Sequence, residues 1–459
     1  MTNFKPSHDT FEIFSYKTLK DLEDRLMDLN LKIPINSEVK ILQESVKLEN
    51  KTIPNRLSIQ PMEGFDANLD GTPSKLTYRR YTRYARGGVG LIWFESTAIN
   101  DECRSNPNQL ILSNLTSNNF KKLVSSTRKI CNKTLKDLGF KDECVLILQL
   151  NHSGRYCVLN GKKHPIRAYH NAELDNERGV SEKDGIVISD DNLEKLENIW
   201  VEKAVLAKEV GFDGVDIKSC HGYLISELLS SRVRENSKYG GESLENRARF
   251  FLNILRKTMK RIKNNKDFLL TSRIGVYDGI PYPNGFGVKE IEKEPFPASI
   301  DLSEPIELIK ELYNIGIRLI NISAGNPHFK AHMTRPYDTP LKGGAIPNEH
   351  PLYSVERLIK MASLVKNQIP KDMIIIGSGL SYLRQFAGYI AAGMIHQKKA
   401  DICGFGRMAF ANPNFPKQIF QKGIIDKREV CITCSGCSRL MRERKNTGCV
   451  IRNPEYQKK

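Results

Sequence analysis

Four cysteines near the carboxyl end of the sequence have the spacing of a metal or cluster ligand set. They follow the pattern C-x₂-C-x₂-C-x₁₁-C in CITCSGCSRLMRERKNTGC, and they are Cys431, Cys434, Cys437 and Cys449. Closely spaced thiolates with one distant thiolate can hold tetrahedral zinc or a [4Fe–4S] cluster. The other six of the ten cysteines are spread singly, which disfavours a secreted disulfide framework. The residues alone leave zinc and iron–sulfur nearly even, with uncoordinated cysteines third.

Polar or glycine-rich residues also follow several apolar runs. The sequences NHSGR, SCHGY and GVYDG follow the runs 145–150, 213–218 and 268–274. Two later runs end in the turns GSG (377–379) and GFGR (404–407), each leading towards a helix start. Glycine lets backbone N–H groups approach a phosphate closely, and a helix N-terminus favours the anion. Because an arginine also ends the second turn, the pair predicts a phosphate site.

These residues need a frame that brings the ends of distant runs together. Short β-branched runs alternate with amphipathic stretches, and they predict strands at 57–61, 90–95, 145–150, 213–218, 268–274, 318–323, 373–378 and 400–405. Several intervening helices are expected to end at a glycine, as at Gly211 and Gly316. Eight such units predict an α/β chain folded as a (β/α)₈ TIM barrel. A doubly wound sheet is the rival, but no G-x-G-x-x-G follows the first run.

The barrel is expected to occupy residues 51–425. Residues 1–50, which include the helical sequence YKTLKDLEDRLMDLN, are expected to form an N-terminal helical extension packed on the barrel. Residues 426–459 form a Cys-rich C-terminal segment with the candidate 4Fe-4S site. Two insertions, 151–190 and 275–303, are rich in Gly, Pro and polar residues, and we expect them to lie over the barrel mouth and shape a substrate pocket.

The composition, with 40% hydrophobic and 27% charged residues, is that of a globular chain with ample material for a core. No apolar run approaches the ~18 residues of a membrane span. The N-terminal sequence is too polar and acidic for a secretory signal, so a cytoplasmic protein is expected. The formal charge of +17 comes from lysines scattered among acidic residues. We therefore expect no nucleic-acid partner, although a basic rim could attract an anionic cofactor, substrate or redox protein.

A further set of motifs runs through the chain in a fixed order. They are NRLSIQPM, ARGGVGLIWFES, LQLNHSGR, GFDGVDIKSCHGYLISELLS with the downstream YGGESLENRARF, TSRIGVYDG, IIGSGL and DICGFGRMAFANPNFP. Together they cover residues 51 to about 420 and resemble the old yellow enzymes, or NADH:flavin oxidoreductases. The cysteines extend the resemblance to the branch of 2,4-dienoyl-CoA reductase and trimethylamine dehydrogenase. The resemblance implies FMN at the barrel mouth and hydride delivery to the activated C=C of an unsaturated carbonyl or enoate.

The resemblance assigns one group of residues to FMN. Pro61 and Met62 would line the flavin edge, Ser96 would abut the ring, and Gln149 would hydrogen-bond the pyrimidine half. Arg273 would lie beside N1 and O2, where a fixed guanidinium favours the charge of the reduced flavin. The residues of the phosphate end would be Gly377, Ser378, Gly379, Gly406 and Arg407. Taken singly, the arginine is better explained by a barrel-mouth ion pair and the glutamine by a satisfied polar cap on a strand. Together, and in register with the two phosphate turns, they favour FMN.

The resemblance assigns three residues of KSCHGY to the substrate. Tyr223 matches the proton donor, and His221 matches one of two donors that hold the carbonyl oxygen. Lys218 stands where the second donor is usually a histidine or a similar group, and its charge predicts a preference for an enoate or another anionic acceptor. Glu63 is a second departure. Its carboxylate would either ionise beside the flavin or turn away to pair with an arginine or lysine.

In that branch the cysteines hold a [4Fe–4S] cluster near the flavin, and the resemblance favours the same cluster here. The branch has one more residue between the second and third cysteines than this chain. Its multidomain members also continue into an FAD- and nucleotide-binding half. Electrons would therefore come from a redox partner protein, or NAD(P)H would reduce FMN directly. Two other functions stay open, an electron-transfer subunit and an amine dehydrogenase of the trimethylamine dehydrogenase type, and a homo-oligomer is also left open.

Overall fold

The computed structural model describes residues 11–262, 267–290, 300–341, 343–344 and 346–457. Its centre is a closed barrel of parallel strands in the order β10-β11-β12-β13-β14-β3-β4-β5. The strands are β3 (Leu57–Ile59), β4 (Leu91–Ala98), β5 (Val145–Asn151), β10 (Gly214–Ile217), β11 (Leu269–Gly275), β12 (Leu319–Ser323), β13 (Ile374–Gly377) and β14 (Ile402–Phe405). The predicted (β/α)₈ barrel is confirmed, and each predicted strand overlaps an observed one.

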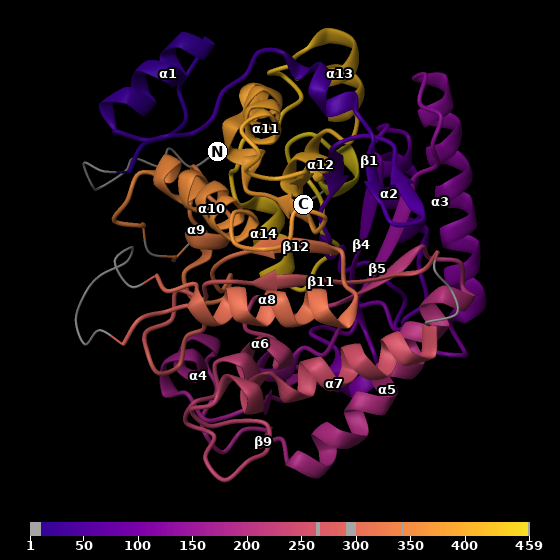
Figure 1. Ribbon diagram of the computed structural model, residues 1–459, viewed down its shortest axis with the longest axis vertical. Helices are drawn as coiled ribbons and strands as arrows, with labels where there is room; N and C mark the ends of the chain where they lie inside the picture. Colours follow the sequence, from indigo (N-terminus) through magenta and orange to yellow (C-terminus); the bar gives the residue numbers. More distant parts are fainter. Residues whose placement is uncertain (1–10, 263–266, 291–299, 342, 345, 458–459) are drawn as a thin grey trace.

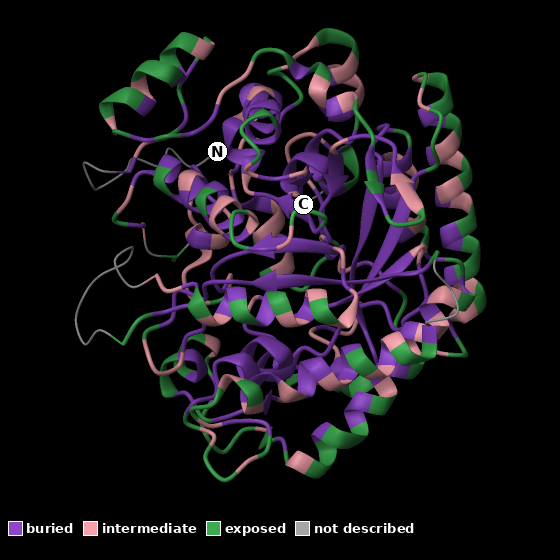
Figure 2. Cartoon of the chain, viewed as in Figure 1, coloured by how far each residue is buried: buried purple, intermediate pink, exposed green. Residues whose placement is uncertain are grey.

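The barrel strands are continuous buried runs rather than alternating ones. Every residue of β4, β5 and β11 is buried, because helices cover the outer face and side chains fill the interior. Figure 2 shows this buried centre beneath helices whose outer faces are exposed. The longer covering helices are α2 (Lys75–Ala85), α3 (Ser117–Asp137), α5 (Asp190–Glu209), α7 (Leu244–Ile262), α8 (Ser303–Ile315), α10 (Pro351–Lys366) and α11 (Ala387–His396).

The expected glycine ends of two helices are present. Gly316 caps α8 with a φ of 108°, and Gly211, with a φ of 98°, directly follows the C-cap of α5. Only glycine adopts this backbone region at little cost. Each turn sends the chain from the outer helix layer back into the next barrel strand.

The N-terminal extension closes one end of the barrel. It contains α1 (Leu19–Asp28), η1 (Val39–Gln43) and β1 (Val46–Leu48), and β1 forms an antiparallel hairpin with β2 (Lys51–Ile53), the first strand after the predicted boundary at residue 50. The buried hairpin side chains cluster with the first residues of the barrel strands, among them Leu91, Val145, Leu269, Leu319, Ile374 and Ile402. The hairpin therefore plugs the amino-terminal end of the barrel. The predicted N-terminal helix corresponds to α1.

Irregular segments with short elements surround the open end of the barrel. They carry η2 (Asp101–Cys103), η3 (Gly154–Tyr156), β6 (Val158–Leu159), β7 (Lys162–Lys163), β8 (Ile166–Arg167), α4 (Ala172–Arg178), β9 (Ile186–Val187), α6 (Leu224–Leu229), α9 (Ala331–Thr334) and η4 (Leu380–Phe386). The first predicted insertion, 151–190, holds η3 to β9. The second, 275–303, is described only in part, because residues 291–299 lie outside the described residues.

The C-terminal part of the chain returns over the barrel mouth (Figure 1). It contains α12 (Arg407–Ala411), α13 (Phe415–Lys422), α14 (Gly436–Arg442) and η5 (Pro454–Tyr456). The backbone N–H of Thr447 donates to the carbonyl of Gly64 at 2.6 Å, and the Ser435 hydroxyl donates to the carbonyl of Thr339 at 2.6 Å. These bonds tie the cysteine-rich segment to loops that follow barrel strands. None of the helices in the described ranges is both long and apolar enough to cross a membrane.

Candidate functional site

A cavity of about 370 Å³ lies at the carboxyl ends of the barrel strands. Side chains from the ends of β10 and β11, from loops after β3, β13 and β14, and from α14 form its wall. Among the predicted residues, those that line it are Pro61, Met62, Ser96, Lys218, His221, Tyr223, Arg273, Ser378, Gly379, Gly406, Arg407 and Cys437. The barrel thus brings together residues that are more than 300 positions apart in the sequence.

Arg273 presents an unpaired cation to this cavity. It is 8% exposed, and its Nε atom has no hydrogen-bond partner among the described residues. Burial lowers the pKa of this guanidinium, against the attraction of Cys220 and Asp216. A buried unpaired donor is costly, so the position suits an electron-rich ligand group. The alternative expectation of a barrel-mouth ion pair has no support, because Arg273 forms no salt bridge in the described structure.

Two predicted FMN residues, Gln149 and Gly377, lie outside the lining of the cavity. The amide of Gln149 is 1% exposed and donates to Oδ2 of Asp216 at 2.6 Å. Asp216 in turn accepts the backbone N–H of Arg273 at 2.7 Å. A Cβ at Gly377 would come within 2.7 Å of Cε of Met394. Gln149 therefore supports the strand that carries Arg273, while Gly377 lets the covering helix pack closely.

The glycine turns and two arginines form one part of the cavity wall, which we name the anion cradle after the phosphate predicted to bind there. Gly379 has a φ of 101°, and a Cβ there would lie 2.5 Å from Cδ1 of Leu358, so the turn requires glycine. Arg407 donates from Nη2 to the carbonyl of Pro336 at 2.6 Å, while its Nη1 has no partner in the described chain. Burial and the neighbouring Arg407 lower the pKa of Arg335 to about 10. Both guanidiniums therefore fit a phosphate group.

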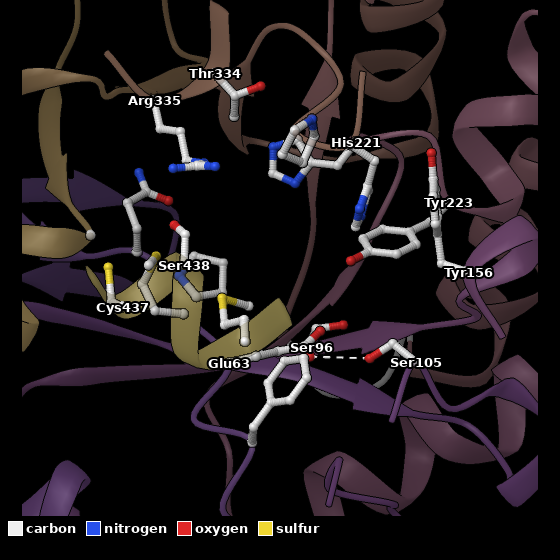
Figure 3. Close-up of a pocket in the computed structure, with 18 of the residues that line it drawn as sticks. Glu63, Ser96, Ser105, Tyr156, His221, Tyr223, Thr334, Arg335, Cys437 and Ser438 are labelled. Carbon is white, nitrogen blue, oxygen red and sulfur yellow. Dashed lines mark hydrogen bonds between the residues drawn. The ribbon is translucent and has the colours of Figure 1, made fainter. Parts of the chain in front are cut away.

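The opposite wall carries the predicted substrate residues. His221 has a φ of 70°, and its Nε2 lies 2.8 Å from the Ser323 hydroxyl. Burial lowers the pKa of His221 well below its usual range, so the imidazole is neutral. Burial also raises the pKa of Tyr223 well above its usual value, so the phenol keeps its proton. Figure 3 shows both side chains directed towards the cavity from neighbouring positions.

Lys218 lies against the ring of Tyr223. Its Nζ atom is 3.9 Å from the ring centroid, the geometry of a cation–π contact. Lys218 is 5% exposed, and burial lowers its pKa, against the attraction of Cys220 and Glu63. Among the described residues no carboxylate forms a salt bridge with it. The lysine therefore has both a tie to the tyrosine and free donor capacity towards the cavity.

Glu63 faces the cavity and takes hydroxyl and amide partners rather than basic ones. Its Oε2 accepts from the Ser105 hydroxyl at 3.2 Å, as Figure 3 shows, and its Oε1 accepts from the Gln109 amide at 3.4 Å. Burial raises the pKa of this carboxyl, while nearby Lys218 opposes the shift. The alternative of a turn outward to an arginine or lysine is not observed in the described residues.

Several lining residues were not predicted from the sequence. They are Gln60, Phe65, Ser105, Tyr156, Val158, Lys163, Arg178, Pro327, His328, Thr334, Arg335, Leu341, Ser381, Gly404, Ser438, Met441, Arg442 and Arg444. Tyr156 stacks on His328 with ring centroids 3.8 Å apart. It directly follows the NHSGR motif, which was the available signal for it. The arginines lie on loops and short helices whose path over the barrel has no periodic signature.

The four candidate metal ligands gather beside the cavity. Cys437 is part of its wall, and burial raises the pKa of the Cys431 thiol to about 12. Backbone N–H groups of Thr433 and Arg452 donate to Cys431 and Cys449 sulfur at 3.4 and 3.3 Å. Within the described ranges no three His, Cys, Asp or Glu side chains are arranged to hold a metal ion. The cluster therefore stays a prediction.

The model of the NADH:flavin oxidoreductase / NADH oxidase family matches residues 42–293, which is more than half of the chain. The chain belongs to this family. The resemblance to the old yellow enzymes seen in the sequence is thus confirmed. Family membership also supports FMN and NAD(P)H as its cofactors.

The curated relatives include proteins of different lengths. The chain is 25% identical over 401 residues to an NADH oxidase of Thermoanaerobacter brockii, covering 85% of this chain and 52% of that protein. It is 25% identical over 434 residues to a cinnamate reductase of Clostridium sporogenes, covering 92% of this chain and 58% of that protein. An NADPH dehydrogenase of Clostridium acetobutylicum is 25% identical over 378 residues, covering 81% and 92%. The chain therefore spans about half the length of the first two.

Solved structures share the fold. A 2-naphthoyl-CoA reductase complex superimposes with a TM-score of 0.68 at 19% identity, covering 91% of this chain and 57% of that one. Morphinone reductase in complex with tetrahydroNAD gives a TM-score of 0.57 at 19% identity, covering 83% and 90%. At this level of identity the similarity concerns the barrel architecture alone.

Proposed function

We propose that the protein is an FMN-dependent ene-reductase that reduces the activated C=C bond of an unsaturated carbonyl compound or enoate. The observation that carries this proposal is the composition of the cavity wall. Unpaired buried guanidinium groups occupy one side, and a neutral imidazole and phenol occupy the other. FMN, when bound, supplies hydride chemistry. The name of the cinnamate reductase relative agrees with an enoate substrate.

The residues present fit FMN by the chemistry of their donors. Arg407 and Arg335 each keep an unpartnered Nη1 beside the glycine turn of Ser378 and Gly379, and these groups would hold the phosphate. Arg273 keeps an unpartnered Nε at the centre of the mouth, and it would hold the electron-rich pyrimidine edge. Pro61, Met62 and Ser96 would line the ring, and Gln149 would act by holding Asp216.

The substrate side would bind and protonate the acceptor. When the Ser323 hydroxyl donates to Nε2 of His221, the remaining imidazole proton is on Nδ1 and can donate to a substrate oxygen. Lys218 would supply the second donor and a charge that favours a carboxylate. Tyr223 would give its phenolic proton to the substrate α-carbon, which is consistent with its protonated state throughout the neutral range.

We further propose that the four cysteines hold a [4Fe–4S] cluster that delivers electrons to the cavity. The set consists of thiolates alone, and two backbone N–H groups already donate to sulfur atoms, which suits ligands that must be deprotonated. We also propose the boundaries 1–50, 51–425 and 426–459 for extension, barrel and cysteine-rich segment. A redox protein or NAD(P)H would be the source of electrons, in a cytoplasmic setting.

The decisive experiment is anaerobic. The purified chain, loaded with FMN, is reduced with NADH, NADPH or dithionite and then mixed with cinnamate, methyl cinnamate or benzylideneacetone while the flavin absorbance is followed. Rapid reoxidation with formation of the saturated product supports the proposal. Reduced protein that is reoxidised by none of these acceptors contradicts it.

The role of Lys218 is tested in the same assay. With Lys218→Gln, the rate with cinnamate is expected to fall about tenfold more than the rate with the ester or ketone. The reason is that the charge of Lys218 stabilises the carboxylate alone, by ~1.4 kcal/mol. An equal loss for all three acceptors would contradict the preference for enoates and leave the reductase proposal intact.

A further inference from the structure

The cavity is lined by basic side chains that lack acidic partners. The eight lysine and arginine residues are Lys163, Arg178, Lys218, Arg273, Arg335, Arg407, Arg442 and Arg444, and the acidic residue in the lining is Glu63. None of these bases takes part in a salt bridge among the described residues, although ion pairs are common elsewhere on the same chain. Such an excess of charge at one site indicates anionic ligands.

Four of these bases have no role in the proposed FMN and carbonyl sites. One is Arg442 on α14, and the other three are Lys163 on β7, Arg178 at the end of α4 and Arg444 after α14. The guanidinium carbon of Arg178 lies 5.2 Å from the ring centroid of Tyr156. Because Tyr156 packs edge-on against Tyr223, Arg178 lies on the substrate side of the cavity.

Backbone carbonyls hold these three side chains without neutralising them. Lys163 Nζ donates to the carbonyl of Arg178 at 2.5 Å, Arg178 Nη2 donates to that of Cys157 at 2.8 Å, and Arg444 Nη1 donates to that of Gly161 at 2.5 Å. The Nε atom of Arg178 is buried and has no partner in the described chain. The three cations are therefore positioned, uncompensated and still able to donate.

The three cations differ in burial, since Arg178 is half-buried while Lys163 and Arg444 are exposed. Burial is the main cause that lowers the pKa of Arg178, and the charge of Arg444 adds a smaller effect in the same direction. An anion bound between the three cations would be attracted by all of them. Three positive charges match a multivalent anion better than one carboxylate, which would neutralise a single charge.

We propose that Lys163, Arg178 and Arg444 form a second anion subsite that binds the phosphate or diphosphate group of a ligand whose reactive end reaches Tyr223. The inference rests on the proposed function, because it takes the reacting position from Tyr223. Two ligands carry this chemistry. One is the nicotinamide dinucleotide that reduces the flavin, and the other is an unsaturated substrate with a phosphorylated carrier.

The subsite is tested first by equilibrium binding. Pyrophosphate is titrated calorimetrically into the FMN-loaded protein, so that the cradle of Arg407 is already filled. The double variant Arg178→Gln/Arg444→Gln is expected to raise the pyrophosphate Kd at least tenfold and to keep its FMN. The matched control is Arg439→Gln, an exposed arginine of the same segment that pairs with Glu443 and does not line the cavity. It is expected to leave the Kd unchanged.

Two results would overturn the subsite. One is an unchanged pyrophosphate Kd in the double variant, and the other is an equal rise in the Arg439 control, which would indicate nonspecific attraction to a basic surface. Because the titration needs no alkene reduction, it remains informative if the proposed reductase activity fails. A protein that binds pyrophosphate through these residues but reduces no alkene would remove the function and keep the subsite.

The two ligand sources are distinguished in the separate half-reactions. If the dinucleotide is the ligand, the double variant weakens flavin reduction by NADPH at least tenfold but not reduction by 1-benzyl-1,4-dihydronicotinamide, which lacks phosphate. If the substrate is the ligand, the variant weakens reoxidation by the coenzyme A thioester of cinnamate but not by cinnamate. If the double variant selectively weakens neither reduction by NADPH nor reoxidation by the thioester, the subsite is contradicted even if pyrophosphate binds.

Discussion

Tyr223 is the side chain on which the proposed proton transfer depends most directly. Burial raises its pKa well above its usual value, and therefore the phenol stays protonated through the neutral and mildly alkaline range. Tyr223→Phe removes the proton and keeps the ring that lies against Lys218. We expect reoxidation of the reduced flavin by cinnamate to slow by about 10²–10³-fold, measured by anaerobic stopped-flow absorbance.

Tyr156→Phe is the matched control for this substitution. Its ring packs edge-on against Tyr223 with centroids 5.6 Å apart, and its hydroxyl accepts from the Asn326 amide at 3.3 Å. Loss of that hydroxyl removes a neighbouring polar contact without removing the proposed acid, so a loss below about tenfold is expected. Equal effects of the two substitutions would argue against Tyr223 as the proton donor.

The raised pKa of the Asp278 carboxyl predicts that the stability of the folded protein depends on pH. Burial raises its carboxyl pKa from 3.8 to about 7, and it accepts the backbone N–H of Phe286 at 3.1 Å. Between pH 4 and 7 the unfolded chain loses this proton and the folded chain keeps it, so stability falls as the pH rises through this window. Asp278→Asn keeps an acceptor and has no proton to lose. We expect the variant to melt above the wild type at pH 8, with a smaller difference at pH 5.

Thermal unfolding at several pH values checks this expectation. Glu95 and Asp216 also have raised pKa values, of about 7 and about 6, but both are present in the two proteins and cancel in the comparison. A difference in Tm that is independent of pH would assign the effect of Asp278→Asn to packing rather than to ionisation.

At the scale of elements, a substitution in the β1–β2 hairpin is expected to lower the stability of the fold without changing ligand binding. Leu48 is 2% exposed and packs in the plug at the amino-terminal end of the barrel, away from the cavity. Leu48→Ala removes buried methyl groups and leaves a void, so we expect the free energy of unfolding to fall by about 3 kcal/mol. Denaturant unfolding measures this loss, and FMN affinity of the folded protein is expected to stay unchanged.

Lys47→Ala is the control, because Lys47 lies on the same strand with its side chain exposed. A change within about 0.5 kcal/mol is expected there. Weakened FMN binding by folded Leu48→Ala would contradict the separation between plug and cavity, since it would show that the two ends of the barrel are coupled.

The barrel strands were predictable, including the three-residue β3, because each is a buried apolar run in a regular alternation with helical stretches. The strand predicted at 145–150 is observed at Val145–Asn151, and the strand predicted at 400–405 is observed at Ile402–Phe405. The hairpin that plugs the barrel was not predicted. Its strands have three residues each, and their burial depends on the barrel they close rather than on their own pattern.

The site was predictable where chemistry is attached to strand ends. Arg273 lies near the end of β11, and His221 and Tyr223 lie in the loop between β10 and α6, so the topology alone brings them together. Arg178 and Arg444 reach the same cavity from α4 and from the C-terminal segment, and tertiary packing of irregular chain decides their positions. The sequence named the residues whose spacing carries a motif and missed those placed by long-range contacts.

At the scale of the whole molecule, hydrogen bonds of Asp338 connect the two terminal segments of the chain. The backbone N–H of Phe14 donates to Oδ1 of Asp338 at 3.2 Å, and the backbone N–H of Asp338 donates to the carbonyl of Thr433 at 3.2 Å. Asp338 thus joins the N-terminal extension to the cysteine-rich segment. The same loop carries Arg335 of the anion cradle. The position of Arg335 therefore depends on the contacts that Asp338 makes with the two terminal segments.

The cysteine-rich segment carries the last prediction, which concerns the redox content of the whole protein. Anaerobically purified protein is expected to contain about four iron and four sulfide per chain beside FMN. Cys434→Ser is expected to lose most of the iron and the electron paramagnetic resonance signal of the reduced cluster while FMN stays bound, because Cys434 is outside the cavity lining. Cys131→Ala, a buried thiol of α3 far along the sequence from this segment, is the control and is expected to keep its iron.

Metal analysis and FMN absorbance of the same samples decide between the alternatives. Zinc in place of iron would make the segment a structural support for the wall that contains Cys437, and Cys434→Ser would then lower the melting temperature without altering any redox signal. FMN without iron or zinc would remove the metal from the proposal. In that case NAD(P)H must reduce the flavin directly, since the cavity would have no internal source of single electrons.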